Sequence, residues 1–125
     1  MTRILLDTQV LLWAVSAHRR LTREARTLIE EHEVLVSAAS IWEIAIKASL
    51  GKLNADPRQV LSALEPTGFL PLPISGLHCA CVVDLPPLHR DPFDRLLIAQ
   101  ATSEPMRFVT TDASLRDYGD IVTVV

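Results

Sequence analysis

Short apolar runs alternate with helix-like patterns along the whole chain. Residues 4–6, 34–36, 108–109 and 121–125 have the length and apolar character of buried β-strands. Consecutive parallel strands need a crossover connection, which is usually a helix and is right-handed. The alternation therefore predicts an α/β fold: one three-layer α/β/α domain over residues 1–125, with a mainly parallel central sheet of four to five strands.

Helix start and stop signals fall between these runs. Gly51 is the expected stop of a helix over residues 37–50, and a further helix is expected to extend to about residue 84. Residues 69–74 look extended, but Pro71 and Pro73 lack an amide hydrogen and restrict this segment to a sheet edge or to a position outside the ladder. The expected N-caps are Thr22, Asp56, Ser75 and Asp91.

The composition is that of a folded protein with a small negative charge. Hydrophobic residues make up 49% of the chain and charged residues 22%, which excludes intrinsic disorder. Twelve basic and fifteen acidic residues give a net charge of −3, which argues against a protein that holds nucleic acid by bulk attraction alone. A polyanion would have to meet a local basic patch or a bound cation.

Export and membrane signals are not evident in the sequence. The apolar start of the chain is interrupted by Asp7 and Gln9, so it lacks the continuous apolar stretch of a signal peptide or a membrane span. The chain has two cysteines, Cys79 and Cys81, which are too few and too close together to cross-link a secreted fold by disulfides. We expect them to be buried free thiols. These features favour a cytoplasmic protein without membrane contact.

Four acidic residues follow the predicted strands or open the predicted helices. Asp7 and Asp112 end strands, Glu43 lies in the helix after the second strand, and Asp94 lies in the first turn of the helix that Asp91 caps. Ligands of parallel sheets bind at the carboxyl ends of the strands. Hard oxygen ligands gathered there are what Mg²⁺ or Mn²⁺ requires, so the placement predicts a divalent-metal site.

Each acid also has a purely local explanation. Asp7 is suited to cap the helix after it, and Glu43 stands three residues after Ser40, as in a capping box. Asp94 suits the positive end of its helix, and Asp112 suits a turn. Their joint placement at one end of the sheet favours the metal site but does not by itself name a reaction.

Other active sites of α/β proteins do not match the sequence. A haloacid-dehalogenase-like phosphatase needs Asp-x-Asp after the first strand, and this chain has Asp7-Thr8-Gln9. The four glycines are scattered, which excludes a P-loop, a Rossmann fingerprint and the Gly-x-Ser-x-Gly motif of serine hydrolases. The four histidines show no ligand spacing, and we expect His89, the one nearest the acidic block, to be a surface or hydrogen-bonded group.

Four blocks of the chain resemble the PIN-domain family, and specifically the VapC-type toxins of bacterial type II toxin–antitoxin systems. The blocks are residues 5–13, 37–47, 88–101 and 109–112, of which the third is the most specific. The family usually has His where this chain has Gln9, a departure that leaves all four acids in place.

This resemblance implies a metal-dependent endoribonuclease that hydrolyses RNA phosphodiester bonds as a toxin. It implies Mg²⁺ or Mn²⁺ as cofactor, a cognate antitoxin as inhibitor and a homodimer as assembly. It also implies that one acidic quartet serves both as catalytic and as metal-binding residues. The matching positions are Asp7, Glu43, Asp94 and Asp112.

Other polar residues near the quartet are candidates for substrate binding or for support of the acids. Thr8 and Thr110 carry hydroxyls beside two of the acids, and Arg90 and Arg95 bracket Asp94 in sequence. The alternative function is a catalytically silent PIN-like binding module that captures an Arg-containing partner segment. The same chemistry would also permit a nuclease acting on DNA or in the maturation of ribosomal RNA.

Overall fold

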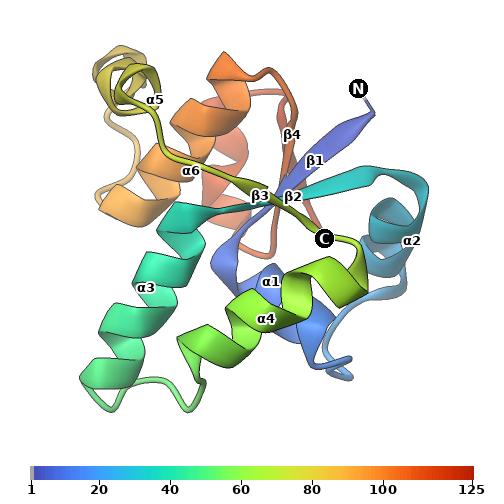
Figure 1. Cartoon of the computed structure of the whole chain (residues 1–125). Helices are drawn as coiled ribbons and strands as arrows, with labels where there is room; N and C mark the ends of the chain where they lie inside the picture. Colours follow the sequence, from blue (N-terminus) through green and yellow to red (C-terminus); the bar gives the residue numbers. More distant parts are fainter. Residues whose placement is uncertain (1) are drawn as a thin grey trace.

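The computed structural model describes residues 2–125 (Figure 1). Five strands form one sheet in the order β3-β2-β1-β4-β5, and all four neighbouring pairs are parallel. The three-layer α/β/α architecture expected from the sequence is confirmed. In chain order the elements are β1 (Arg3–Leu6), α1 (Thr8–Val15), α2 (Arg23–Glu31), β2 (Glu33–Ser37), α3 (Ala38–Ser49), α4 (Pro57–Thr67), β3 (Leu70–Leu72), α5 (Gly76–Cys81), η1 (Val82–Asp84), α6 (Pro92–Ser103), β4 (Arg107–Thr110), η2 (Ala113–Tyr118) and β5 (Val122–Val124).

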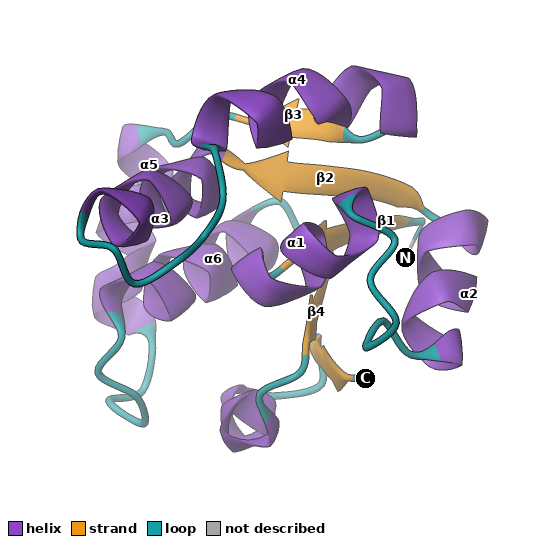
Figure 2. Cartoon of the chain, turned by 90° about the horizontal axis from the view of Figure 1, so that it is seen from below, coloured by secondary structure: helices purple, strands orange, loops and turns teal. Residues whose placement is uncertain are grey.

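Alternating side chains of the central strands enter two separate cores. In β1, Ile4 and Leu6 pack beneath α1, α2 and α4, whereas Leu5 packs with residues of α6 on the other side. Figure 2 shows these helices on opposite sides of the sheet. Because both faces are covered, the central strands are continuously apolar, as the sequence shows. The two cores fix the sheet between the helical layers.

The expected caps and edges are largely confirmed. The side chains of Thr22, Asp56, Ser75 and Asp91 each accept a hydrogen bond from a backbone amide in the first turn of the following helix. The proline-containing strand β3 lies at an edge of the sheet, where a missing amide hydrogen costs nothing.

Two local expectations need correction. The helix that Ser75 caps ends at Cys81, and residues 82–84 form the separate 3₁₀ turn η1. Both cysteines are free, but Cys79 is exposed and Cys81 half-buried, so neither is a core thiol. Among residues 2–125, no helix has the length and apolar character needed to cross a membrane.

Candidate active site

Asp7 is held at the carboxyl end of β1 by its neighbours in space. Its backbone amide donates to the carbonyl of Val109 at 2.9 Å, which continues the pairing of β1 with β4. One carboxylate oxygen caps α1 by accepting from the amide of Val10 at 2.9 Å, and the other accepts from the hydroxyl of Thr110. The local explanation of Asp7 as a helix cap is therefore correct. It does not compete with a site role, because each carboxylate oxygen has a second lone pair.

Glu43 is buried on α3 and held by two other side chains. Thr8 donates to its Oε1 at 2.5 Å, and Lys47, one turn later on α3, donates to its Oε2 at 2.6 Å. The capping box with Ser40 does not form, because Ser37 caps α3 and the hydroxyl of Ser40 instead lies 3.2 Å from the hydroxyl of Thr8. The local explanation of Glu43 is therefore wrong.

Asp94 lies in the first turn of α6, where its neighbour Asp91 is the N-cap. The Asp91 carboxylate accepts from the amides of Phe93 at 2.8 Å and of Asp94 at 3.1 Å. Because Asp91 does the capping, the Asp94 side chain remains available to the site, where it is 22% exposed.

Asp112 follows β4 and is the most open of the four acids, with its side chain 44% exposed. Its backbone amide donates to Thr110 at 3.0 Å, and its Oδ1 accepts from the amide and the hydroxyl of Ser114. The two hydrogen bonds from Ser114 lower the pKa of Asp112 below its ordinary value, and the bond from the Ser114 hydroxyl has the larger effect.

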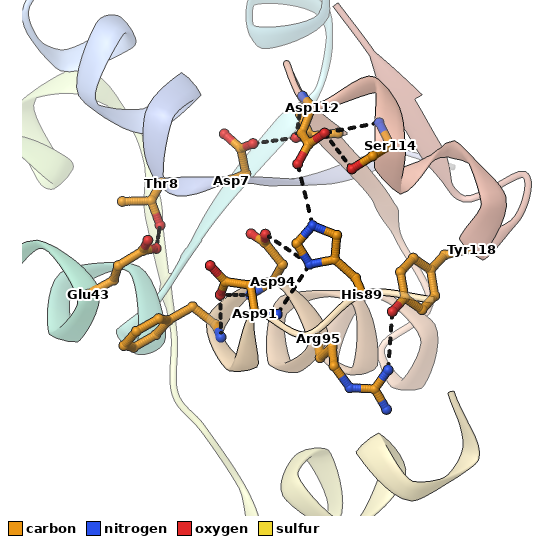
Figure 3. Close-up of polar contacts among 12 residues, drawn as sticks. Asp7, Thr8, Glu43, His89, Asp91, Asp94, Arg95, Asp112, Ser114 and Tyr118 are labelled. Atoms are coloured by element: carbon orange, nitrogen blue, oxygen red, sulfur yellow. Dashed lines mark hydrogen bonds and ion pairs between the residues drawn. The ribbon is translucent and has the colours of Figure 1, made fainter. Parts of the chain in front are cut away.

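All four acids line one cavity of about 320 Å³ at the carboxyl ends of the strands. Figure 3 shows Asp7, Asp94 and Asp112 converging from three segments that are distant in sequence. Asp91 also lines this cavity, whereas Lys47 is the one basic residue among the described residues that do so. The carboxylates thus outnumber the cations in a confined space.

This excess of negative charge changes how the acids ionise. Burial, followed by repulsion from Asp91, Asp7, Glu43 and Asp112, raises the pKa of Asp94 to about 7. Burial also raises the pKa of Asp7, although its hydrogen bond from Thr110 opposes the effect. The hydrogen bond to Glu43 raises the pKa of Lys47. A divalent cation would relieve this repulsion, so the donor set fits a hard metal ion.

His89 joins the site although the sequence did not favour it. Its Nδ1 lies 3.9 Å from Asp94 Oδ2, and its Nε2 lies 3.8 Å from Asp112 Oδ2. Within residues 2–125, these three side chains are the one His, Cys, Asp or Glu group whose possible ligand atoms all lie within 4.8 Å of one another. The spacing of residues along the chain did not reveal His89 as a neighbour of Asp112. His89 lies in the loop before α6, whereas Asp112 follows β4. Its position two residues before the cap of α6 was the available signal.

The two arginines expected near Asp94 are not brought to the cavity. Arg95 donates to the carbonyls of Pro86 at 3.0 Å and Val82 at 3.2 Å, and to the hydroxyl of Tyr118 at 3.1 Å. Figure 3 shows its guanidinium beside Tyr118 and directed away from the carboxylates. Arg90 is exposed and lines a separate groove. Arg95 follows Asp94 on α6 and therefore faces a different direction. Arg90 lies in the loop before α6, so closeness in sequence to Asp94 did not place either side chain in the site.

Comparison with known proteins places this architecture in a family. The PIN domain family matches residues 4–121. The chain belongs to the PIN-domain family. This PIN domain is 35% identical over 123 residues to Ribonuclease VapC22 of Mycobacterium tuberculosis, a match that covers 94% of the chain and 93% of the relative. The resemblance to VapC-type proteins is therefore confirmed.

Solved structures share the fold of this PIN domain at low sequence identity. VapBC2 from Rickettsia felis, bound to a DNA fragment from its promoter, matches with a TM-score of 0.69 and 15% identity, over 98% of this chain and 97% of the other. DNA-bound VapBC from Salmonella typhimurium matches with a TM-score of 0.65 and 19% identity, over 99% and 98% of the two chains. The backbone that positions the acids is thus shared with these proteins.

Proposed function

We propose that this PIN domain is a metal-dependent endoribonuclease that acts as the toxin of a type II toxin–antitoxin pair. The observation that carries the proposal is the convergence of Asp7, Glu43, Asp94 and Asp112 on one cavity. The relative with 35% identity is named a ribonuclease, which supports RNA as the substrate.

Asp7, Asp94 and Asp112 are the residues that would hold Mg²⁺ or Mn²⁺. Bound there, such an ion supplies Lewis-acid stabilisation of the phosphate and lowers the pKa of the attacking water. Thr110 orients two of these acids, since its hydroxyl donates to Asp7 and accepts from the amide of Asp112. Their positions are therefore set before any ion arrives.

The remaining polar groups position the acids or the water. Thr8 and Lys47 fix both oxygens of Glu43, so that this longer carboxylate is held at the wall of the cavity, where it can orient the nucleophile. His89 lies between Asp94 and Asp112, and its Nδ1 accepts from the amide of Asp91 at 3.2 Å, which leaves Nε2 to face Asp112 Oδ2. Arg90 and Arg95 have no part in this scheme.

A direct test compares RNA cleavage by the purified chain with Mg²⁺ and with EDTA. Asp7→Asn and Asp94→Asn are expected to lower the cleavage rate at least about 100-fold, because each removes a charge needed to bind the ion. Asp117→Asn, on the exposed surface of η2, is the matched control and should retain the wild-type rate. Cleavage that persists in EDTA or in both site variants would contradict the proposal.

Inhibition by a cognate antitoxin is part of the same proposal. The acidic cavity suits an Arg side chain from an antitoxin, which would pair with the carboxylates and exclude the metal. The structural relatives from Rickettsia and Salmonella are themselves VapBC assemblies. Alanine replacement of the antitoxin's basic residues should restore cleavage; inhibition that survives it would refute this mode of binding.

We also propose a cytoplasmic homodimer. Trp42 is 57% exposed and packs edge-on against Phe93, with ring centroids 5.2 Å apart, in a mainly apolar groove of about 430 Å³. A second copy of the chain would cover this aromatic pair. Trp42→Glu should shift the sedimenting species from dimer to monomer, whereas an unchanged dimer would place the interface elsewhere.

The binding module without catalysis is not favoured. Capture of a basic segment would not need a carboxylate whose pKa is raised to about 7 by burial and by the repulsion of its acidic neighbours. A calorimetric titration of the partner-free chain with Mn²⁺ separates the two functions. Heat of binding supports the nuclease, and its absence would support the module.

A further inference from the structure

A second cavity opens directly off the carboxylate cavity, between α1 and α4. These two helices lie side by side across the front of the sheet (Figure 1). The second cavity, of about 560 Å³, shares Gln9, Leu12 and Leu53 with the first, so that the two form one continuous surface. Its size falls in the range of about 300–1,000 Å³ that is typical of ligand sites. We call it the α1–α4 groove.

The lining of the α1–α4 groove combines an aromatic surface with amide side chains. Trp13 on α1 stacks with His18, with ring centroids 5.9 Å apart and planes inclined by 20°. Gln9, Asn54 and Gln59 line the same groove and are exposed. Aromatic faces stack on unpaired bases, and amide groups donate to and accept from base edges. This combination is suited to a nucleobase.

The lining of the α1–α4 groove carries little charge, in contrast to the carboxylate cavity. Asp56 is the single acidic residue among the described residues that line it, and one oxygen of Asp56 caps α4 by accepting from the amide of Arg58. A lining with so little charge does not repel a phosphate as the carboxylate cavity does, and it offers an Arg-containing peptide no acidic partner besides Asp56.

We infer that the α1–α4 groove is a nucleotide subsite, in which Asn54 and Gln59 read the base next to the scissile phosphate of a single-stranded RNA. The inference rests on the proposed function, because a phosphate held by the carboxylate cavity brings the adjoining nucleotide to this groove. Trp13, which lines the groove, supports the base. Base selection thus belongs to α4 and the segment before it, whereas cleavage belongs to the acids.

The test measures base preference separately from cleavage. The full chain with Mg²⁺ cuts a pool of randomised single-stranded RNA, and sequencing of the product ends gives the base frequencies beside each cut. Asn54→Ala and Gln59→Ala should each reduce the preference at one position about fivefold, as expected for one lost hydrogen bond. The total cleavage rate should fall less than the preference does. Ser62→Ala, on the same helix but outside the groove, is the matched control and should leave the preference unchanged.

A second readout uses the position of Trp13 in the groove. In the Trp42→Phe variant, Trp13 is the remaining tryptophan and the acids that would hold the ion are intact. Adding a single-stranded RNA hexamer with Mg²⁺ should change the Trp13 emission to a saturating limit. Emission that stays constant at RNA concentrations that saturate cleavage by the wild-type chain would overturn the inference.

The outcomes separate this inference from the function on which it rests. Cleavage without base preference, or with a preference that survives both substitutions, overturns the subsite alone. If the two substitutions weaken inhibition by an antitoxin but leave base preference intact, the groove binds protein and the inference is wrong. If no RNA is cleaved, the proposed function fails and the subsite fails with it.

Discussion

At the scale of single residues, the fold changes the protonation of Asp94. The carboxyl group ionises near 3.8 in an unfolded chain and near 7 in the folded protein without metal. Between these values the folded state holds a proton that the unfolded state has lost. The free energy of unfolding therefore decreases as the pH rises through this window, and this decrease is complete above pH 7.

Asp94→Asn should accordingly stabilise the metal-free protein. At pH 8 in EDTA, we expect the free energy of unfolding to rise by about 1–3 kcal/mol, because a neutral amide avoids both the burial of a charge and the repulsion of four acids. The gain should fall by more than half at pH 5. Urea denaturation at the two pH values measures it, with Asp117→Asn as control. A lower free energy of unfolding for Asp94→Asn than for the wild-type protein at pH 8 would show that the ionised carboxylate of Asp94 does not destabilise the fold.

Thr110 is a second residue whose role can be tested by an isosteric change. Thr110→Val removes the hydrogen bond to the buried Asp7 and the acceptor for the amide of Asp112. We expect a loss of about 1–3 kcal/mol in the free energy of unfolding, since buried polar groups are left without partners. RNA cleavage should fall as well. Thr110→Ser keeps the hydroxyl and should restore both; failure of serine to do so would assign the effect to packing.

At the scale of elements, the beginning of α6 combines two functions in adjacent acids. Asp91 caps the helix, and its charge is the largest of the repulsions that raise the pKa of Asp94. The cap needs only an oxygen acceptor, whereas the repulsion needs a charge. The two contributions can therefore be separated by substitution.

Asp91→Asn and Asp91→Ala should behave differently. Asn preserves the cap, so the free energy of unfolding should not decrease, while the pKa of Asp94 moves down toward its ordinary value. Ala removes the cap and should cost about 1 kcal/mol. Urea denaturation measures the stability, and NMR titration of the Asp94 carboxyl carbon measures the pKa. An unchanged pKa in Asp91→Asn would show that the charge of Asp91 does not contribute to the shift.

At the scale of the whole molecule, the metal is expected to stabilise the fold. The acids belong to the ends of β1 and β4 and to α3 and α6, so an ion bound among them would connect both layers of helices through the sheet. A ligand that binds only the folded state raises stability by mass action. Protonation of Asp94 competes with the ion, and the coupling should therefore depend on pH.

We expect Mn²⁺ to raise the melting temperature of the wild-type chain, and EDTA to reverse the change. The rise should be larger at pH 8 than at pH 6, because Asp94 is mostly protonated below its pKa of about 7. Differential scanning calorimetry at both pH values measures the effect, and Asp7→Asn should largely lose it. An equal rise at both pH values would exclude Asp94 from the metal site.

Much of the fold followed from the sequence because its signals are local. Apolar runs, caps such as Thr22 and Asp91, and the prolines of β3 act through their own neighbours in the chain, and the structure kept them in their expected roles. The acids were found for a related reason: parallel topology brings all strand ends to one edge, so a residue that follows a strand is placed there without knowledge of its side chain.

The tertiary structure alone decided which side chains accompany the acids. His89 lies in the site because its loop passes the end of β4. Arg95 lies outside the site and donates to the carbonyls of Val82 and Pro86. Thr8 met Glu43 because α1 and α3 pack side by side. Such contacts depend on the path of a loop and the rotation of a helix. These are set by packing between segments far apart in the chain, and no local pattern of residues encodes them.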